Sequence, residues 1–281
     1  MYKIMEKTYL KQLFDVIIIG ASTDGIALCE YLVSKKPDIK TLIVAENTNN
    51  ILQKHKLENT VIVKDKVIYS SYNHSVIGLN LESGDQIFAT NVVIATGTKP
   101  KRISLNTQNI YYKTTTCDVC SKSKQAIVVG DKLRAVSAAI WASKKFRYVY
   151  LCSKVFNLKA PDKDLEKLAA CENVVHLPNC SIIDVKNNKY GELEEVTLDT
   201  YSTIKCSAIL VISDRLPDVP QLHPQMVEIE DGYIKINHQG QTTKIPKMFA
   251  LGGCTKYKSK RNIAITGKTI LKANGWKKEN D

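Results

Sequence analysis

Two cysteines separated by two residues, Cys117 and Cys120, are the side chains whose type and spacing could most directly do chemistry. A pair at this spacing can close into a disulfide and reopen, and the thiolate form is the nucleophile in that exchange. A structural zinc site would need a second close pair of ligands, and the sequence has none. The spacing therefore favours a redox-active dithiol without a metal. Two free thiols in a loop are the alternative.

The remaining sequence predicts a cytoplasmic protein without a disulfide framework. The N-terminal stretch MYKIMEKTYLKQLFD is charged and lacks the apolar core of an export signal. No apolar run reaches the roughly 18–20 residues of a membrane span, so no membrane association is expected. Structural disulfides are rare in the cytoplasm. Single cysteines, mostly within apolar segments, are therefore expected to be buried and unreactive: Cys29, Cys152, Cys171, Cys180 and Cys206.

The elements that must position the cysteine pair begin with a nucleotide-binding pattern near the N-terminus. "DVIIIG" is typical of a buried strand with a tight turn at Gly20, and a helix is predicted from about Thr23. "TLIVAEN" follows as a second strand that ends at Glu46, and an acid about 20 positions beyond the turn is typical of a dinucleotide-binding β-α-β unit. Gly20 and Gly25 match the outer glycines of G-x-G-x-x-G, and Ser22 replaces the middle one.

A second β-α-β pattern follows the cysteine pair, as the strand "QAIVVG", the helix "KLRAVSAAIWASKK" and the strand "YVYLCS". Short alternating strands precede this pattern, and a strand and a helix, "NIAITGKTILKAN", close the chain. We therefore predict an α/β fold with two Rossmann-like nucleotide-binding domains, the second inserted into the first. The expected boundaries are 1–109 with 230–281 for the first domain and 110–229 for the central domain.

The chain is basic, with 40 lysines and arginines against 28 acidic residues and a formal net charge of +12. Such an excess favours an acidic partner, although solvated charge in a lysine-rich sequence would produce the same count. Residues 121–160 carry nine basic residues against Asp131 as the one acid. No helix-turn-helix, zinc-finger or RNA-binding aromatic motif is present, so nucleic acid is not expected as a partner.

The order of the motifs resembles that of the low-molecular-weight thioredoxin reductases over nearly the whole chain. "DVIIIGASTDG" is similar to their FAD-binding turn, "NVVIATGTKPKRI" to the segment that closes their flavin domain, and "DGYIKINHQGQTTKIPKMFALGG" with "RNIAITG" to their C-terminal motifs. The resemblance implies a homodimeric flavin-dependent disulfide reductase with FAD as cofactor and a thioredoxin-like protein as substrate. The positions it places at FAD are Gly20, Ala21, Ser22, Gly25, Glu46, Ala95, Thr96, Gly97, Gly252, Gly253, Arg261, Asn262 and Ile263.

The second turn departs from this family where typical members bind NADPH. They carry G-G-G-x-[ST]-A and then His-Arg-Arg, whereas this chain has "GDKLRA" from Gly130 and "CSK" from Cys152. The side chains of Lys132 and Leu133 add bulk and Asp131 adds a negative charge where a pyrophosphate would approach. The arginines that would bind a phosphate through two hydrogen bonds are missing. In this respect the chain resembles the ferredoxin-dependent flavin thioredoxin reductases, which implies ferredoxin or flavodoxin as electron donor. A diflavin-linked type, with a second FAD in the central domain, is an alternative.

A second departure lies in the C-terminal motif, where the aspartate of the family's "GD" falls at Gly253 and Cys254 follows. Backbone N–H groups of residues 252–254 could still hold a phosphate, so FAD remains the expected cofactor. Two other interpretations stay open. One is a reductase of the ferredoxin–NADP type, which the retained cysteines disfavour, and the other is a non-catalytic flavin-binding or sensor protein.

The resemblance also implies roles for the cysteines. Cys120 would take electrons from FAD and Cys117 would attack the substrate disulfide, and we expect Lys122 and Lys124 to lower the thiol pKa. Family members carry an acid directly after the second cysteine, which makes Asp118 a catalytic candidate. A shifted register would place Thr114 in the first slot and Cys117 in the second, and would displace Cys120.

Overall fold

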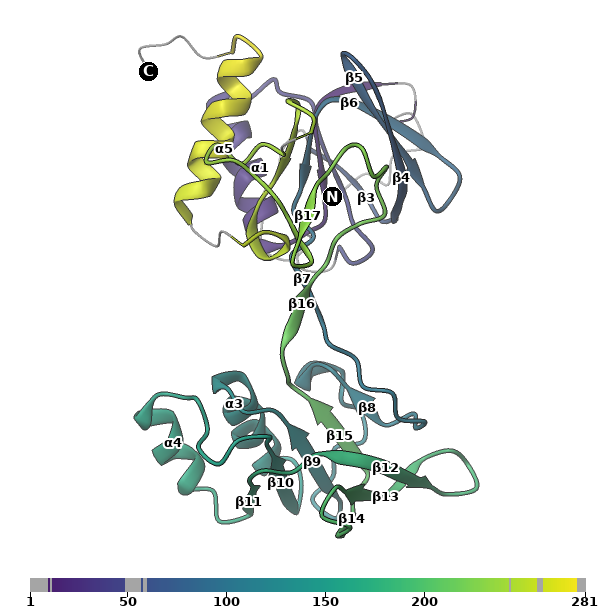
Figure 1. Ribbon diagram of the computed structural model, residues 1–281, viewed down its shortest axis with the longest axis vertical. Coiled ribbons are helices and arrows are strands. Elements are labelled where there is room, and N and C mark those ends of the chain that lie inside the picture. The colour runs from purple at the N-terminus through teal and green to yellow at the C-terminus, as the bar shows by residue number, and fades with distance from the viewer. Residues whose placement is uncertain are drawn as a thin grey trace. The chain divides into compact units, whose positions relative to one another are not determined.

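The computed structural model describes residues 10, 12–48, 57, 60–242, 244–256 and 260–276. The chain divides into two compact units (Figure 1). Unit 1 comprises Met1–Lys99 and Leu216–Asp281, and unit 2 comprises Pro100–Arg215.

The borders of the inserted unit differ from the expected ones at 109/110 and 229/230. Ile103 and Leu105 pack against a core cluster of unit 2, which moves the first border towards the N-terminus. Met226 and Val227 are buried in a core cluster of unit 1, which ties the segment before residue 230 to that unit. Both borders therefore depend on apolar side chains that are buried in the connecting segments. No sequence motif marks these segments.

Unit 1 is built on a mixed sheet. Its parallel part runs β3-β2-β1-β6-β19, and β5 and β4 extend β6 as an antiparallel ribbon. The strands are β1 (Leu13–Ile19), β2 (Thr41–Val44), β3 (Thr60–Val63), β4 (Val67–Asn73), β5 (Val76–Leu81), β6 (Gln86–Ile94) and β19 (Met248–Ala250), and the helices are α1 (Thr23–Lys35) and α5 (Lys260–Ala273).

The alternation of apolar side chains along β1 produces two core layers in unit 1. Val16 and Ile18 belong to the cluster that contains α1 and α5, which lie side by side in Figure 1. Ile17 and Ile19 belong to the opposite cluster, with the ribbon strands. A strand buried on both faces is typical of a parallel sheet, as the continuous run "VIII" predicts.

Unit 2 contains a parallel sheet in the order β11-β10-β9-β15-β8. One core layer of this sheet includes α3, and the other includes residues of the antiparallel sheet β12-β13-β14. The elements are β8 (Ile110–Tyr111), β9 (Gln125–Val129), α3 (Leu133–Ser143), β10 (Tyr148–Cys152), α4 (Asp162–Ala169), β11 (Val174–Leu177), β12 (Ile182–Asn187), β13 (Leu193–Leu198), β14 (Thr203–Lys205) and β15 (Ala208–Val211).

The predicted β-strand–helix–β-strand order of both units is present, whereas α4 was not predicted because it buries few apolar residues. Short elements complete the fold: β7 (Thr98–Pro100) paired with β16 (Arg215–Pro217), β17 (Ile229–Glu230) paired with β18 (Tyr233–Ile234), and the 3-10 turns η2 (Thr114–Thr116) and η3 (Gly252–Cys254). Among the described residues, no helix has both the length and the apolar character that crossing a bilayer requires.

Candidate redox and cofactor sites

The predicted cysteine pair is brought together in the segment between η2 and β9. Cys120 Sγ donates to Cys117 Sγ at 3.4 Å and to the Cys117 carbonyl oxygen at 3.5 Å. Both side chains are half-buried and pack against the core cluster that contains α3. Thr114, the first position of the shifted register, lies in η2, where its carbonyl accepts from Cys117 N. The geometry is that of a dithiol one bond-forming step from a disulfide.

The environment of Cys117 differs from the expected one. Burial raises the pKa of the Cys117 thiol to about 12, and the adjacent Cys120 sulfur acts in the same direction. Lys122 donates instead to the Ser143 carbonyl oxygen at 3.1 Å, and Lys124 is exposed. The expectation of a lowered Cys117 pKa is therefore wrong for this dithiol state, because desolvation is the largest cause and disfavours the thiolate.

Asp118 is held by a tyrosine that the sequence patterns did not single out. The Tyr111 hydroxyl donates to Asp118 Oδ1 at 2.6 Å and accepts from Asn109 Nδ2 at 3.3 Å. The hydrogen bond from Tyr111 lowers the pKa of the exposed Asp118 carboxyl, while burial and this acid raise the pKa of Tyr111 to about 12. The carboxylate thus fixes the loop after η2 to β8. No spacing in the sequence points to this contact.

The first glycine turn is a tight cradle in unit 1. A Cβ built on Gly20, which has φ +99°, would lie 2.5 Å from Thr96 Cα and 2.7 Å from the Ala95 carbonyl oxygen. One built on Gly25 would lie 2.7 Å from Ala95 Cβ. Ser22 caps α1 by accepting from Gly25 N at 3.2 Å. The turn and the segment after β6 therefore approach as closely as glycine permits, as an FAD-binding turn requires.

The C-terminal glycines complete the same cradle. A Cβ on Gly253 would lie 2.7 Å from Thr98 Cγ2 and 3.1 Å from the Gly97 carbonyl carbon. Cys254 is buried, and its thiol donates to the carbonyl oxygens of Leu251 and Ile94. Burial raises the pKa of Cys254, and its two hydrogen bonds to main-chain carbonyl oxygens support the turn.

The residues around the cradle fit FAD, with one opposing charge. Glu46 is exposed just beyond β2, where a carboxylate can reach ribose hydroxyls. Asp24, in the first turn of α1, faces Gly252 so closely that its carboxylate would collide with a Cβ there. A carboxylate at the helix N-terminus competes with a phosphate for the same positive potential. Asp24 was not among the expected FAD positions, although the sequence shows it between Ser22 and Gly25.

Three predicted FAD positions lie at the start of α5. Ile263 packs against the cluster that contains α1, and Asn262 is half-buried. The side chain of Arg261 lies outside the described residues. Among those described, no group of three or more His, Cys, Asp or Glu side chains could hold a metal ion.

The second glycine turn is covered by its own chain. A Cβ on Gly130 would lie 2.7 Å from the Ile212 carbonyl oxygen. This contact with the neighbouring backbone explains the glycine without any bound cofactor. Leu133 N, at the start of α3, donates to the Lys159 carbonyl oxygen at 3.1 Å, and Lys159 N donates to the Asp131 carbonyl oxygen at 2.7 Å. Lys132 forms an ion pair with Asp214. The Leu133 N–H and the Lys132 ammonium, which would meet a pyrophosphate, are thus already engaged.

The position of the missing arginines is also closed. Ser153 is buried, and its hydroxyl donates to the Val155 carbonyl oxygen at 2.7 Å and lies 2.8 Å from His176 Nε2. Lys154, the remaining cation, is exposed. One lysine cannot reproduce the planar, bidentate geometry that arginine offers a phosphate.

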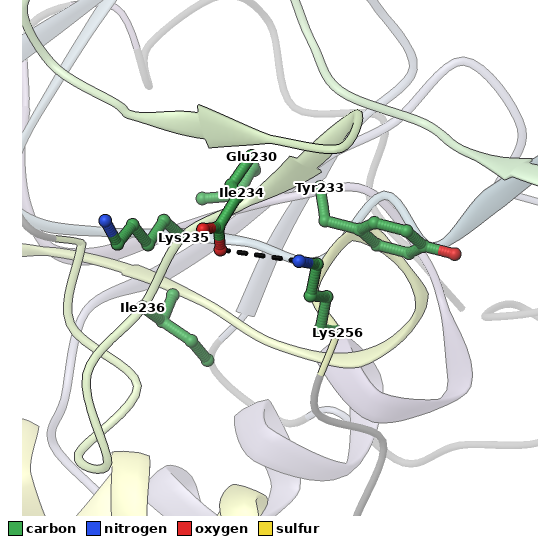
Figure 2. Close-up of a pocket in the computed structure, with 6 residues that line it drawn as sticks. All are labelled: Glu230, Tyr233, Ile234, Lys235, Ile236 and Lys256. Atoms are coloured by element: carbon green, nitrogen blue, oxygen red, sulfur yellow. Dashed lines mark hydrogen bonds and ion pairs between the residues drawn. The ribbon is translucent and has the colours of Figure 1, made fainter.

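A surface pocket elsewhere in unit 1 carries charges that neutralise one another. It is lined by Glu230, Tyr233, Ile234, Lys235, Ile236 and Lys256, and Figure 2 shows the Lys256 ammonium pointing at the Glu230 carboxylate. Lys256 Nζ lies 3.4 Å from Glu230 and 2.7 Å from Asp231, and Lys235 pairs with Glu228 at 2.9 Å. We assign no chemistry to this pocket.

The chain is similar to known proteins over most of its length. A family model described as pyridine nucleotide-disulphide oxidoreductase matches residues 14–269. The thioredoxin reductase of Buchnera aphidicola subsp. Schizaphis graminum is 26% identical over 258 residues, which cover 84% of this chain and 80% of that protein. The thioredoxin reductase of Mycoplasma genitalium is 22% identical over 292 residues, which cover 90% of this chain and 90% of that protein.

Solved structures share the fold. The thioredoxin reductase of Lactococcus lactis superposes with a TM-score of 0.78 at 15% identity, covering 94% of this chain and 98% of that one. The thioredoxin reductase of T. acidophilum gives a TM-score of 0.76 at 17% identity, covering 94% and 97%. The predicted α/β arrangement with two Rossmann-like units is thereby confirmed.

Proposed function

This chain belongs to the pyridine nucleotide-disulphide oxidoreductase family, a family of FAD-binding enzymes, and on that premise we propose that it reduces a protein disulfide with electrons from ferredoxin or flavodoxin. FAD would lie over the cradle of Gly20, Gly25, Gly97 and Gly253, and Cys117 with Cys120 would form the redox pair. The substrate would be a thioredoxin-like protein and the assembly a homodimer, as the resemblance implies, and we expect the protein to be cytoplasmic.

The observation that carries the donor proposal is the occupied N-terminus of α3. A dinucleotide phosphate is normally held by free N–H groups at this position of a β-α-β unit. Here the Leu133 N–H already donates to Lys159, and the adjacent Asp131 backbone accepts from the same residue. NADPH would have to displace these two main-chain hydrogen bonds and approach the acidic side chain of Asp131. This arrangement supports a donor that does not use the turn.

Residues 153–160, called the covering segment because Lys159 contacts the second glycine turn, present a surface suited to an acidic protein. Lys154 and Lys159 are exposed near the α3 N-terminus, and a backbone bridge joins Lys159 to Lys132, whose charge is paired with Asp214. Phe156 is 69% exposed and Leu133 is 40% exposed. Exposed apolar side chains among lysines are typical of an interface in which charge steers the encounter and apolar contact holds it. Acidic electron carriers match that pattern.

The chemistry of the chain's own residues is thiol–disulfide exchange. When bound, FAD would relay electrons from the donor to the Cys117–Cys120 disulfide. The Cys117 thiolate then attacks the substrate disulfide, whose S–S bond breaks as a mixed disulfide forms, and the departing thiolate takes a proton. The Cys120 thiolate attacks Cys117 Sγ, which releases the second substrate thiol and restores the Cys117–Cys120 disulfide. Asp118, fixed by Tyr111, holds the loop that carries both sulfurs.

An anaerobic titration of the flavin band tests this proposal. Reduced ferredoxin should bleach the band and NADPH should not, with uptake of about four electrons per chain for one flavin and one disulfide. Rapid bleaching by NADPH would overturn the donor assignment. Uptake of about two electrons would show that the cysteines are not coupled to the flavin and would favour a binding or sensor role. Two flavins per chain would favour the diflavin-linked alternative.

A further inference from the structure

A second pair of cysteines lies in unit 2, apart from the Cys117–Cys120 pair. Cys152 ends β10, Cys180 follows β11, and their Sγ atoms are 2.9 Å apart. Their side chains are buried, with 0% of Cys152 and 4% of Cys180 exposed. The expected burial of these two thiols is confirmed, and the parallel pairing of β10 with β11 brings together residues 28 positions apart that the sequence shows singly.

The backbone on both sides holds this pair in place. Cys180 N donates to the Ser153 carbonyl oxygen at 2.9 Å, and Ser153 N donates to the Leu177 carbonyl oxygen at 3.0 Å. The Cys152 thiol also donates to the Cys180 carbonyl oxygen at 3.3 Å. Two main-chain hydrogen bonds flank the two sulfurs. The proximity of the two sulfurs therefore depends on the backbone as well as on side-chain rotation, and a disulfide requires them to approach by about 1 Å.

We propose that Cys152 and Cys180 form a second redox couple, which closes to a disulfide when hydrogen peroxide oxidises it. The more accessible Cys180 would attack the peroxide, so that the O–O bond breaks, a sulfenic acid forms and one water leaves. Cys152 would then attack the Cys180 sulfur, form the S–S bond and release a second water. Both thiol protons end in water, and the two electrons reduce the peroxide. Burial raises the pKa of the Cys152 thiol, which disfavours its thiolate form.

The disulfide would connect two segments at the carboxyl end of the central sheet. Cys152 O accepts from Gly130 N at 3.0 Å. The hydroxyl of Ser153, the next residue, is hydrogen-bonded to His176 Nε2. Oxidation would therefore tie the segment after β11 to the segment beside the second glycine turn. Closing this loop restricts the unfolded chain, which stabilises the folded state. The couple is a site of oxidative modification that leaves the Cys117–Cys120 chemistry free.

Peptide mapping of the full chain with its bound cofactor tests the proposal directly. The wild-type protein is treated with hydrogen peroxide, unfolded, blocked with N-ethylmaleimide, digested and analysed by mass spectrometry without reductant. We expect a cross-linked peptide containing Cys152 and Cys180, while the buried Cys206 carries maleimide. Maleimide on both Cys152 and Cys180, in a sample whose Cys117–Cys120 pair is oxidised, would overturn the proposal. Oxidation of Cys180 to a sulfinic acid would overturn it equally.

Thermal unfolding gives a second, independent readout. In a Cys117→Ser/Cys120→Ser background, peroxide should raise the melting temperature by about 5 °C or more. Adding Cys180→Ala should abolish that shift, whereas the matched change Cys206→Ala, in the same core cluster, should keep it. The same rise in melting temperature with and without the Cys180 thiol would contradict the proposed disulfide. Neither readout depends on the electron donor, so failure here and failure of the proposed function are separable.

Discussion

The turn at Gly20 in unit 1 and the turn at Gly130 in unit 2 both join a buried parallel strand to a helix, and in both the glycine faces a neighbouring backbone. A Cβ would meet Thr96 Cα at the first and the Ile212 carbonyl oxygen at the second. The difference lies at the helix N-terminus. Ser22 caps α1, whereas a main-chain carbonyl from Lys159 covers α3. Glycine at such a turn therefore indicates close packing against a neighbouring backbone. Whether a phosphate can bind there depends on which hydrogen bonds the N–H groups of the helix N-terminus already make.

The largest expected effect comes from removing either sulfur of the Cys117–Cys120 pair. Cys117→Ser or Cys120→Ser should lower disulfide reductase turnover by about a thousandfold or more, because the exchange needs both sulfurs. FAD content, measured from the visible spectrum, should not change, since the cradle lies in unit 1. Cys206→Ser serves as the control. Full activity in either pair variant would show that the shifted register or another thiol carries the reaction.

The pH dependence of Cys117 alkylation should be steep. With a pKa of about 12, the thiol loses its proton only at high pH, so the thiolate fraction rises as pH rises. The rate with iodoacetamide should grow about tenfold per pH unit from pH 7 to pH 10, whereas an unperturbed cysteine levels off near pH 9. Rates would be measured on reduced protein by mass spectrometry. A plateau below pH 9 would contradict the desolvated environment of Cys117.

The two glycines can be compared by the same substitution. Gly20→Ala and Gly130→Ala should each lower the free energy of unfolding by roughly 2–5 kcal/mol, because both combine a left-handed φ with a backbone clash. Chemical denaturation of the holoprotein measures this loss. Only Gly20→Ala should also release FAD, which the flavin absorbance of the desalted protein reports. Loss of flavin from Gly130→Ala alone would reverse the assignment of the two turns.

The covering segment of unit 2 should matter for the donor. Lys154→Glu with Lys159→Glu should slow flavin reduction by ferredoxin about tenfold at low salt and less at high salt, as expected for electrostatic steering. Lys186→Glu with Lys205→Glu, at exposed lysines on β12 and β14, is the control with the same total charge change. Stopped-flow traces at two ionic strengths provide the rates. Equal slowing by the control would locate the effect in net charge and not in this surface.

The smallest expected effect concerns Asp24. Asp24→Asn removes a negative charge from the first turn of α1 while keeping the side-chain size, so FAD should bind about three- to tenfold more tightly. Flavin fluorescence titration of the apoprotein measures the dissociation constant. Glu30→Gln, an exposed acid farther along the same helix, is the matched control. Weaker binding in Asp24→Asn would mean that this carboxylate assists the cofactor.

Local patterns were sufficient for the β-α-β elements of both units and for the contact between Cys117 and Cys120. Helix α1 begins at Thr23 as its glycine turn predicts, and α3 lies within the predicted helix. The Cys117–Cys120 contact follows from a spacing of three residues, which a single turn of chain can close. Helix α4 and the unit borders escaped prediction, because they depend on a few apolar residues buried in cores that sequence periodicity does not reveal.

By itself, the sequence determined that this protein has two nucleotide-binding patterns, one nearly intact and one degenerate, and a dithiol between them. Periodicity, turn glycines and short spacings are local features, because they depend only on residues that are close together in the sequence. Only the tertiary structure decided that Lys159 covers the α3 N-terminus, that Tyr111 holds Asp118, and that Cys152 meets Cys180. These contacts join residues between 7 and 28 positions apart. They exist because strand pairing and core packing bring those segments together, which no local pattern specifies.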